Sequence, residues 1–172
     1  MTKKLLFTAA GLLLVWLAAQ AAGPNPQNQV DAKAAYARLG TLAGEWEADT
    51  SMGKVHVSYE LIAGGSALVE RESMEHMPAM ETVYHLDGNR LQLTHYCALG
   101  NQPRMEARAY DAKTGNLEFG FLNATNLASP AASHMHNATF RFVDDKHFTA
   151  VWELYENGAR KSVETAQYTR VR

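Results

Sequence analysis

The stretch LQLTHYC, residues 91–97, alternates apolar and polar side chains along its whole length. Successive side chains of a β-strand point to opposite faces, so a period of two predicts a strand with one buried face. That face carries Leu91, Leu93, His95 and Cys97. The predicted inner face therefore combines apolar packing residues with a histidine and the single cysteine of the chain.

Five further stretches show the same alternation: residues 55–61, 104–109, 117–121, 139–142 and 148–154. Turn-forming residues separate them, including Asp87-Gly88-Asn89 and Glu156-Asn157-Gly158. Asp-Gly and Asn-Gly pairs favour tight hairpins because these residues tolerate a positive φ angle. The spacing predicts about ten strands joined by short turns, without the long crossovers that parallel strands need.

Amphipathic strands of this kind bury their apolar faces by closing on themselves or by stacking as two sheets. We predict an all-β fold, an up-and-down antiparallel barrel of about ten strands, with eight strands in a true lipocalin arrangement as the alternative. A short helix is predicted from Val30 to Leu39, capped by Asn28 or Asp31 and ended by Gly40. We expect it to pack on one barrel end, and the connection from 124 to 133 to flank a mouth.

The first residues have the pattern of an export signal. Lys3 and Lys4 precede an apolar run from Leu5 to Ala18, and Ala19-Gln20-Ala21 offers the small residues of a cleavage site. We expect a signal peptide at 1–21, a linker at 22–29 and the barrel domain at 30–172, in a periplasmic or secreted protein. Cleavage after Gly23 and an uncleaved anchor are the alternatives, although the apolar run is shorter than the roughly 20 residues of a membrane-spanning helix.

The formal net charge of −2 becomes about −4 when Lys3 and Lys4 are removed. Such a chain lacks the basic footprint of a nucleic-acid-binding protein, and no Lys/Arg cluster indicates a membrane-surface patch. We therefore expect no nucleic-acid partner and no stable membrane anchor after cleavage. Because one cysteine cannot form a disulfide within the chain, the fold must depend on its core. The oligomeric state is left open.

Gly44-Glu45-Trp46 stands at the start of the first predicted strand, directly after the short helix. This placement resembles the Gly-x-Trp signature of the calycin, or lipocalin-like, families. In those families the tryptophan closes one end of the barrel and an arginine of the last strand packs on its face. The resemblance assigns that cation–π role to Arg170 or Arg172.

A longer resemblance covers most of the chain after the export signal. It is carried by the segments 42–46 (LAGEW), 84–88 (YHLDG), 94–98 (THYCA) and 100–105 (GNQPRM). Together they look like an uncharacterised family of exported bacterial proteins, the DUF1579-like group, whose described relatives in shape are nitrobindin-like and fatty-acid-binding-like barrels. The resemblance implies the fold and export, and it brings no catalytic residues. No histidine follows Trp152, so the haem-ligand context of nitrobindins is not matched.

Barrels of this size enclose a cavity that holds one small ligand. We predict non-enzymatic binding of an apolar or amphipathic molecule, oriented by His95 and His136. The predicted lining is Tyr59, Leu93, His95, Cys97, Met105, Phe119, Phe121, His136, Phe140 and Trp152. An inward Arg71 would add a contact to a carboxylate head group, as in fatty-acid-binding barrels, or would pair with a neighbouring glutamate.

Metal or haem binding is the second hypothesis. His95 and Cys97 at i and i+2 are parallel neighbours on one strand face, and His134 and His136 repeat the spacing. If His95, Cys97 and His136 converge across the lumen, they suit zinc or copper. The segment 74–80 (MEHMPAM) holds ligands for copper(I), or flexible packing over an apolar ligand. The more ordinary interpretation is a buried cysteine and a hydrogen-bonded core histidine. The sequence specifies no cofactor.

Two further functions stay open. A thiolate at Cys97 beside the imidazole of His95 would make an enzyme, which we regard as the least favoured function. Ser66 is not in a Gly-x-Ser-x-Gly context, and the chain has no phosphate-binding glycine loop or dinucleotide fingerprint. The last alternative is a filled barrel that serves as a structural or partner-binding module.

Overall fold

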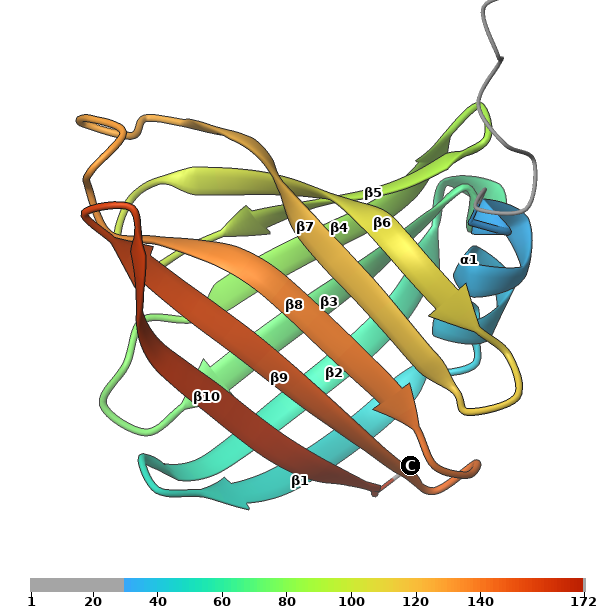
Figure 1. Ribbon diagram of the computed structural model, residues 1–172. Helices are drawn as coiled ribbons and strands as arrows, with labels where there is room; N and C mark the ends of the chain where they lie inside the picture. Colours follow the sequence, from blue (N-terminus) through green and yellow to red (C-terminus); the bar gives the residue numbers. More distant parts are fainter. Residues whose placement is uncertain (1–29, 172) are drawn as a thin grey trace, which may run out of the picture.

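The computed structural model describes residues 30–171, which form one closed antiparallel barrel (Figure 1). Each strand pairs with its neighbours in sequence, and β1 closes the barrel against β10. The strands are β1 (Gly44–Thr50), β2 (Gly53–Ile62), β3 (Ala67–Met74), β4 (Met80–Asp87), β5 (Arg90–Tyr96), β6 (Gln102–Asp111), β7 (Asn116–Thr125), β8 (His134–Phe142), β9 (His147–Glu156) and β10 (Ala159–Arg170). The ten-stranded prediction is confirmed, and the eight-stranded alternative is wrong. The predicted signal peptide and linker lie outside the described residues.

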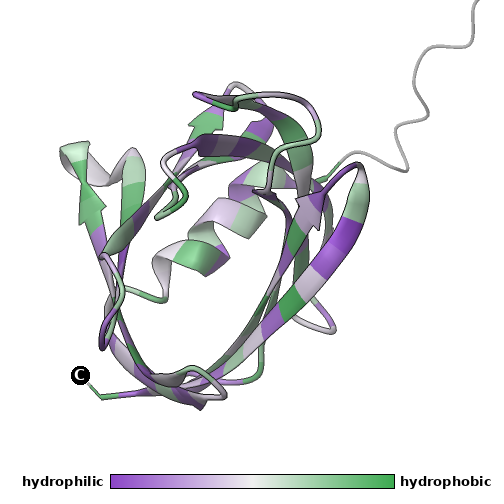
Figure 2. Cartoon of the chain, turned by 90° about the vertical axis from the view of Figure 1, so that its left-hand side faces the viewer, coloured by the Kyte–Doolittle hydropathy of each residue, from purple (hydrophilic) through white to green (hydrophobic). Residues whose placement is uncertain are grey.

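The helix α1 (Ala32–Gly40) covers one end of the barrel, and Figure 2 looks through the opposite end towards it. A carboxylate oxygen of Asp31 accepts a hydrogen bond from the backbone N–H of Ala34 at 3.0 Å, which is the N-cap that the sequence predicts. The helix buries Ala32, Ala35 and Leu39 against the barrel. A 3₁₀ turn (Ala63–Gly65) links β2 and β3. Within residues 30–171 no helix has the length and hydropathy to cross a membrane.

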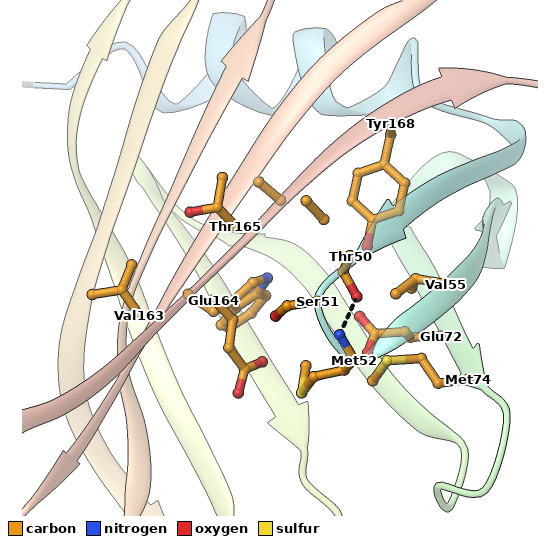
Figure 3. Close-up of a pocket in the computed structure, with 13 residues that line it drawn as sticks. Thr50, Ser51, Met52, Val55, Glu72, Met74, Val163, Glu164, Thr165 and Tyr168 are labelled. Atoms are coloured by element: carbon orange, nitrogen blue, oxygen red, sulfur yellow. Dashed lines mark hydrogen bonds between the residues drawn. The ribbon is translucent and has the colours of Figure 1, made fainter.

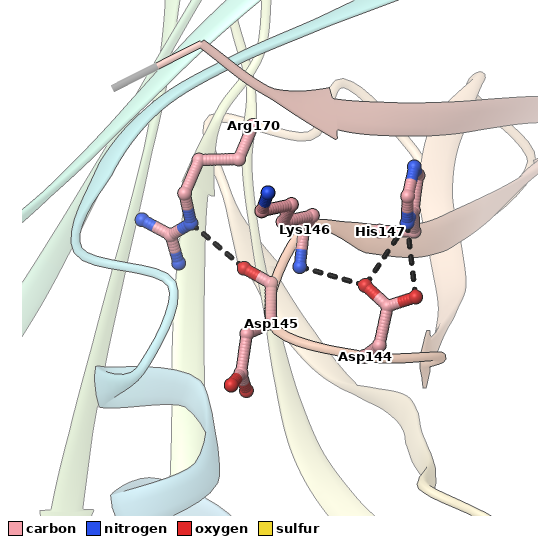
Figure 4. Close-up of polar contacts among 5 residues, drawn as sticks. All are labelled: Asp144, Asp145, Lys146, His147 and Arg170. Atoms are coloured by element: carbon pink, nitrogen blue, oxygen red, sulfur yellow. Dashed lines mark hydrogen bonds and ion pairs between the residues drawn. The ribbon is translucent and has the colours of Figure 1, made fainter.

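Trp46 and Arg170 close the barrel beside the helix. Trp46 is fully buried, and its Nε1–H donates to the backbone oxygen of Leu42 at 2.7 Å. The Arg170 guanidinium lies 4.1 Å from the centre of the Trp46 ring, so the predicted cation–π contact is confirmed. The same guanidinium donates at 2.7–2.9 Å to the backbone oxygens of Thr41, Ala43 and Asp145, the last of them in the β8–β9 turn (Figure 4).

Aromatic side chains fill the barrel from this closed end to its middle. Phe148 packs edge-on against Trp46, with ring centres 4.8 Å apart, and stacks on Tyr168 at 4.7 Å. Phe140 continues the cluster towards Tyr84, with ring centres 6.0 Å apart. Burying a side chain of this size stabilises a fold by about 2–3 kcal/mol. The middle of the barrel is therefore a packed core.

Two seams between neighbouring strands open away from the helix. β1 and β10 are paired only at Trp46–Arg170 and Glu47–Thr169. β7 and β8 are paired from Asn116–Arg141 to Gly120–Asn137, and the rest of both strands separates. Figure 1 shows both pairs of strands diverging from the helix end. These two seams position the two hollows described next.

Candidate functional site

The first hollow is a cavity of about 100 Å³ at the open part of the β1–β10 seam (Figure 3). The turn between β1 and β2 supplies one wall, with Thr50, Ser51 and Met52, and β10 supplies another with residues 163–166. Met74 of β3 and Trp152 of β9 add apolar surface. The cavity therefore lies where the aromatic core ends and the seam has opened.

Two glutamates reach this cavity from opposite walls, Glu72 of β3 and Glu164 of β10 (Figure 3). Register pairs Glu72 with Val57, which is fully buried, and Glu164 with Trp152, so both carboxyl groups lie on the inner face. Burial, together with the charges of Glu70 and Glu164, raises the pKa of Glu72 to about 7. Burial also raises the pKa of Glu164. Among the described residues, neither glutamate forms an ion pair.

A third inner glutamate, Glu70, is held deeper in the barrel and is 4% exposed. The Tyr84 hydroxyl donates to its Oε2 at 2.5 Å, and Tyr59 also hydrogen-bonds to it. Burial raises the pKa of Glu70 to about 7, against the opposite effect of these two hydrogen bonds. A carboxyl group with this pKa holds a proton for much of the time at neutral pH.

His95 lies on the inner face of β5, beside Glu70 and Thr82 in the barrel wall. Its Nδ1 is 2.9 Å from Thr82 Oγ1, and its ring centre is 5.0 Å from that of Trp152. The other ring nitrogen, Nε2, is buried and has no hydrogen-bond partner within residues 30–171. Burial lowers the pKa of His95 to about 4, so the ring is neutral at neutral pH.

Cys97 is half-buried and is a free thiol. Burial raises its pKa, and the charges of Glu164 and Glu72 act in the same direction. The thiol is therefore protonated at neutral pH, which is opposite to what a nucleophilic cysteine needs. These electrostatics disfavour the proposed thiolate beside His95.

The second hollow, of about 430 Å³, lies in the β7–β8 seam and holds His134 and His136. His134 Nδ1 is 2.8 Å from the backbone oxygen of Ala132, and its Nε2 is 3.0 Å from His136 Nδ1. Because a carbonyl oxygen only accepts, His134 carries its proton on Nδ1 and accepts from His136 with Nε2. His136 stacks between Phe121 and Tyr155, at ring-centre distances of 4.7 and 4.1 Å.

The predicted lining residues fall into three places. Leu93, Met105, Phe119 and Phe140 belong to the packed core, and Tyr59 is buried against Glu70. Trp152 lines the seam cavity, and His95 packs against Trp152. Burial and the charges of both cavity glutamates raise the pKa of Cys97. Phe121 and His136 lie in the β7–β8 hollow. His136 stands at a bulge of β8.

The inward placement of Arg71 is wrong. Its guanidinium is on the outer surface, where Nη1 donates to Glu60 at 2.9 Å and Nε to Glu81 at 3.2 Å. Leu68 packs in the core, and the strand period of two then places Glu70 and Glu72 on the same inner face. The other alternative for Arg71, an ion pair with neighbouring glutamates, is the one seen in the structure.

The convergence of His95, Cys97 and His136 is also wrong. His95 packs on Trp152, whereas His136 is enclosed by Phe121, Tyr155 and His134 in the other seam. The described part of the chain contains no group of three or more His, Cys, Asp or Glu side chains placed to hold a metal ion.

Sequence reasoning did not identify Glu72, Glu164 and Tyr168 as cavity residues. A signal was present in β3, where Leu68, Glu70, Glu72 and Met74 share one parity, so two acids stand on an otherwise apolar face. On β10, residues 164, 166 and 168 likewise share a face. Glutamates are almost never fully buried in proteins unless they are paired, so composition alone does not favour an inward position for these acids.

The fold and the site define a closed ten-stranded antiparallel barrel with a helix at one end, a packed core, and a cavity of apolar walls with two glutamates towards the other end. A solved structure with a similar fold is Rv2717c from M. tuberculosis, with a TM-score of 0.57 and 12% sequence identity. The match covers 80% of this chain and 98% of that one, and at this identity it concerns the fold alone. No protein-family model and no curated protein matches the sequence.

Proposed function

We propose that the protein binds a small amphipathic molecule in the cavity of the β1–β10 seam. The observation that carries this proposal is the composition of the cavity, in which apolar walls from Met74 and Trp152 surround two half-buried carboxyl groups that form no ion pair within residues 30–171. Ligand sites combine a mostly apolar surface with a few polar groups that fix orientation. The packed aromatic core limits the ligand to the open end of the barrel.

The proposed role is non-enzymatic. The raised pKa of Cys97 keeps its thiol protonated, and the lowered pKa of His95 makes its imidazole a weak base, so the pair is poorly suited to form a reactive thiolate at neutral pH. The ligand's apolar part would contact Trp152 and Met74, and its polar part would face Glu72 and Glu164. We also propose that the chain is exported with removal of residues 1–21, which the basic, apolar and small-residue pattern of the N-terminus supports.

The test is a titration with hexan-1-ol, an apolar chain with one hydroxyl group, followed by NMR. We expect the indole N–H signal of Trp152 to shift and that of Trp46, in the closed end, to stay. Ala166→Phe places a large ring in the cavity and should weaken binding at least tenfold. Gln167→Phe is the matched control, because residue 167 is the exposed neighbour on the same strand.

Binding by Gln167→Phe should stay within twofold of the unmodified protein. The proposal fails if hexan-1-ol and its charged analogues hexylammonium and hexanoate all leave the Trp152 signal unchanged, or if Ala166→Phe, shown by circular dichroism to be folded, binds as well as its control.

A further inference from the structure

The inner wall of the seam cavity is acidic, and among the described residues that line it none is basic. Glu70, Glu72 and Glu164 are the charged residues at the inward-facing strand positions of this region. Arg71 is on the outer surface, where it pairs with glutamates. Arg170 is in the closed end, over Trp46. Within residues 30–171, the carboxyl groups of Glu72 and Glu164 thus have no basic side chain as a partner.

These carboxyl groups repel one another in surroundings of low dielectric constant. The pKa of Glu72 is about 7 because of burial and because of the nearby charges of Glu70 and Glu164. A negatively charged ligand would increase that repulsion, whereas a cation would offset it and lower the cost of ionising both cavity glutamates. The electrostatics of the cavity therefore favour a positively charged occupant.

Two further features of the wall fit an organic cation. Trp152 and Tyr168 bring aromatic rings to the cavity, and indole and phenol faces attract ammonium groups. Next to this wall, the ring of His95 packs on Trp152, and its Nε2 has no hydrogen-bond partner within residues 30–171 although the residue is only 5% exposed. Buried polar atoms are nearly always hydrogen-bonded, so this nitrogen can make one further polar contact inside the barrel.

We infer that the ligand of this cavity is an ammonium compound with a short apolar chain, held with its charged nitrogen between Glu72 and Glu164. The chain lies along Met74 and Trp152. This inference rests on the proposed function and adds the chemical class of the ligand to it. Apolar walls on several sides distinguish the site from one for an inorganic cation, which needs oxygen ligands around it.

The pH dependence follows from the groups that face Glu72. Glu70 and Glu72, whose pKa values are raised to about 7, lose their protons as the pH rises through 7, and burial raises the pKa of Glu164 as well. Tyr168 and Cys97 have raised pKa values and stay neutral there. An alkylammonium ion keeps its charge throughout, so its affinity should increase between pH 5.5 and pH 8.

Calorimetry at pH 8 with hexylammonium, hexan-1-ol and hexanoate compares three head groups on one chain. We expect hexylammonium to bind at least tenfold more tightly than hexan-1-ol, and hexanoate to bind most weakly. Glu72→Gln and Glu164→Gln should each weaken hexylammonium binding about tenfold and leave hexan-1-ol within twofold. Glu118→Gln, on the exposed outer face of β7, is the control and should change neither affinity.

Two results would overturn the inference while the proposed function stands: hexan-1-ol or hexanoate binding at Trp152 as tightly as hexylammonium, or hexylammonium affinity unchanged in both glutamine variants. If none of the three compounds binds, the proposed function falls and the inference falls with it.

Discussion

At the scale of single residues, the inner glutamates distinguish this barrel from one with a purely apolar interior. Glu70 is enclosed on all sides, and the Tyr84 and Tyr59 hydroxyls satisfy its carboxyl group. A buried carboxylate that lacks a cation is costly, so the group takes up a proton more readily than it does in water. The inner acids therefore link the stability of the fold to pH.

The variant Glu70→Gln tests this link. The folded pKa of about 7 lies above the unfolded value of 4.5, so the stability contributed by protonated Glu70 is complete below pH 4.5 and is lost as the pH rises through 7. A glutamine has no proton to lose. Its free energy of unfolding relative to the unmodified protein should increase by roughly 2–3 kcal/mol between pH 5 and pH 8, measured by urea denaturation. A difference that is the same at both pH values would contradict the assignment.

At the scale of elements, the end of β10 closes the barrel with little strand pairing. β1 and β10 share only two register pairs, and Arg170 compensates by contacting Trp46 and three backbone oxygens. These oxygens belong to the α1–β1 connection and to the β8–β9 turn, so a single side chain joins three segments. A planar guanidinium can donate in several directions at once, which an ammonium on a flexible stem does less well.

We therefore expect Arg170→Lys to lower the free energy of unfolding by about 1–3 kcal/mol although the charge is kept. Arg160→Lys is the matched control, because Arg160 is an exposed residue of the same strand that pairs with Glu153. It should change stability by less than about 0.5 kcal/mol. Equal effects of the two substitutions in chemical denaturation would show that the contacts of Arg170 do not stabilise the closure.

At the scale of the whole molecule, one end of the barrel is sealed and the other is open at two seams. The helix, Trp46 and the aromatic core fill the sealed half, so binding is confined to the other half. Cys97 has no disulfide partner within the chain, and the fold depends on this core alone.

Mass spectrometry of the protein isolated from its own cells tests export directly. Removal of residues 1–21 should give a chain that begins at Ala22, present outside the cytoplasm and without a disulfide. A chain that retains Lys3 and Lys4 would contradict cleavage. Under native conditions, the same sample should show added mass if the ligand stays bound during isolation.

The calycin resemblance implied the closing contact of Trp46 with Arg170 or Arg172, and the structure places Arg170 there. The sequence's own patterns determined the number of strands, the capped helix and the inward face of His95. These features follow from local rules, since the period of two and the turn residues act within a few positions of the chain. The same rule could have predicted the inner face of β3, because the apolar Leu68 lies on the same strand face as Glu70 and Glu72.

Only the tertiary structure decided which inner residues meet. His95 and His136 both lie on strands with a suitable spacing, yet a bulge in β8 and the opening of the β7–β8 seam place His136 with Phe121 and Tyr155. Glu72 and Glu164 are 92 positions apart in the sequence. They share a cavity because β1 and β10 separate beyond the Glu47–Thr169 pair, on the side away from the helix. Closure of the barrel sets these long-range distances, and no local pattern encodes where a seam opens.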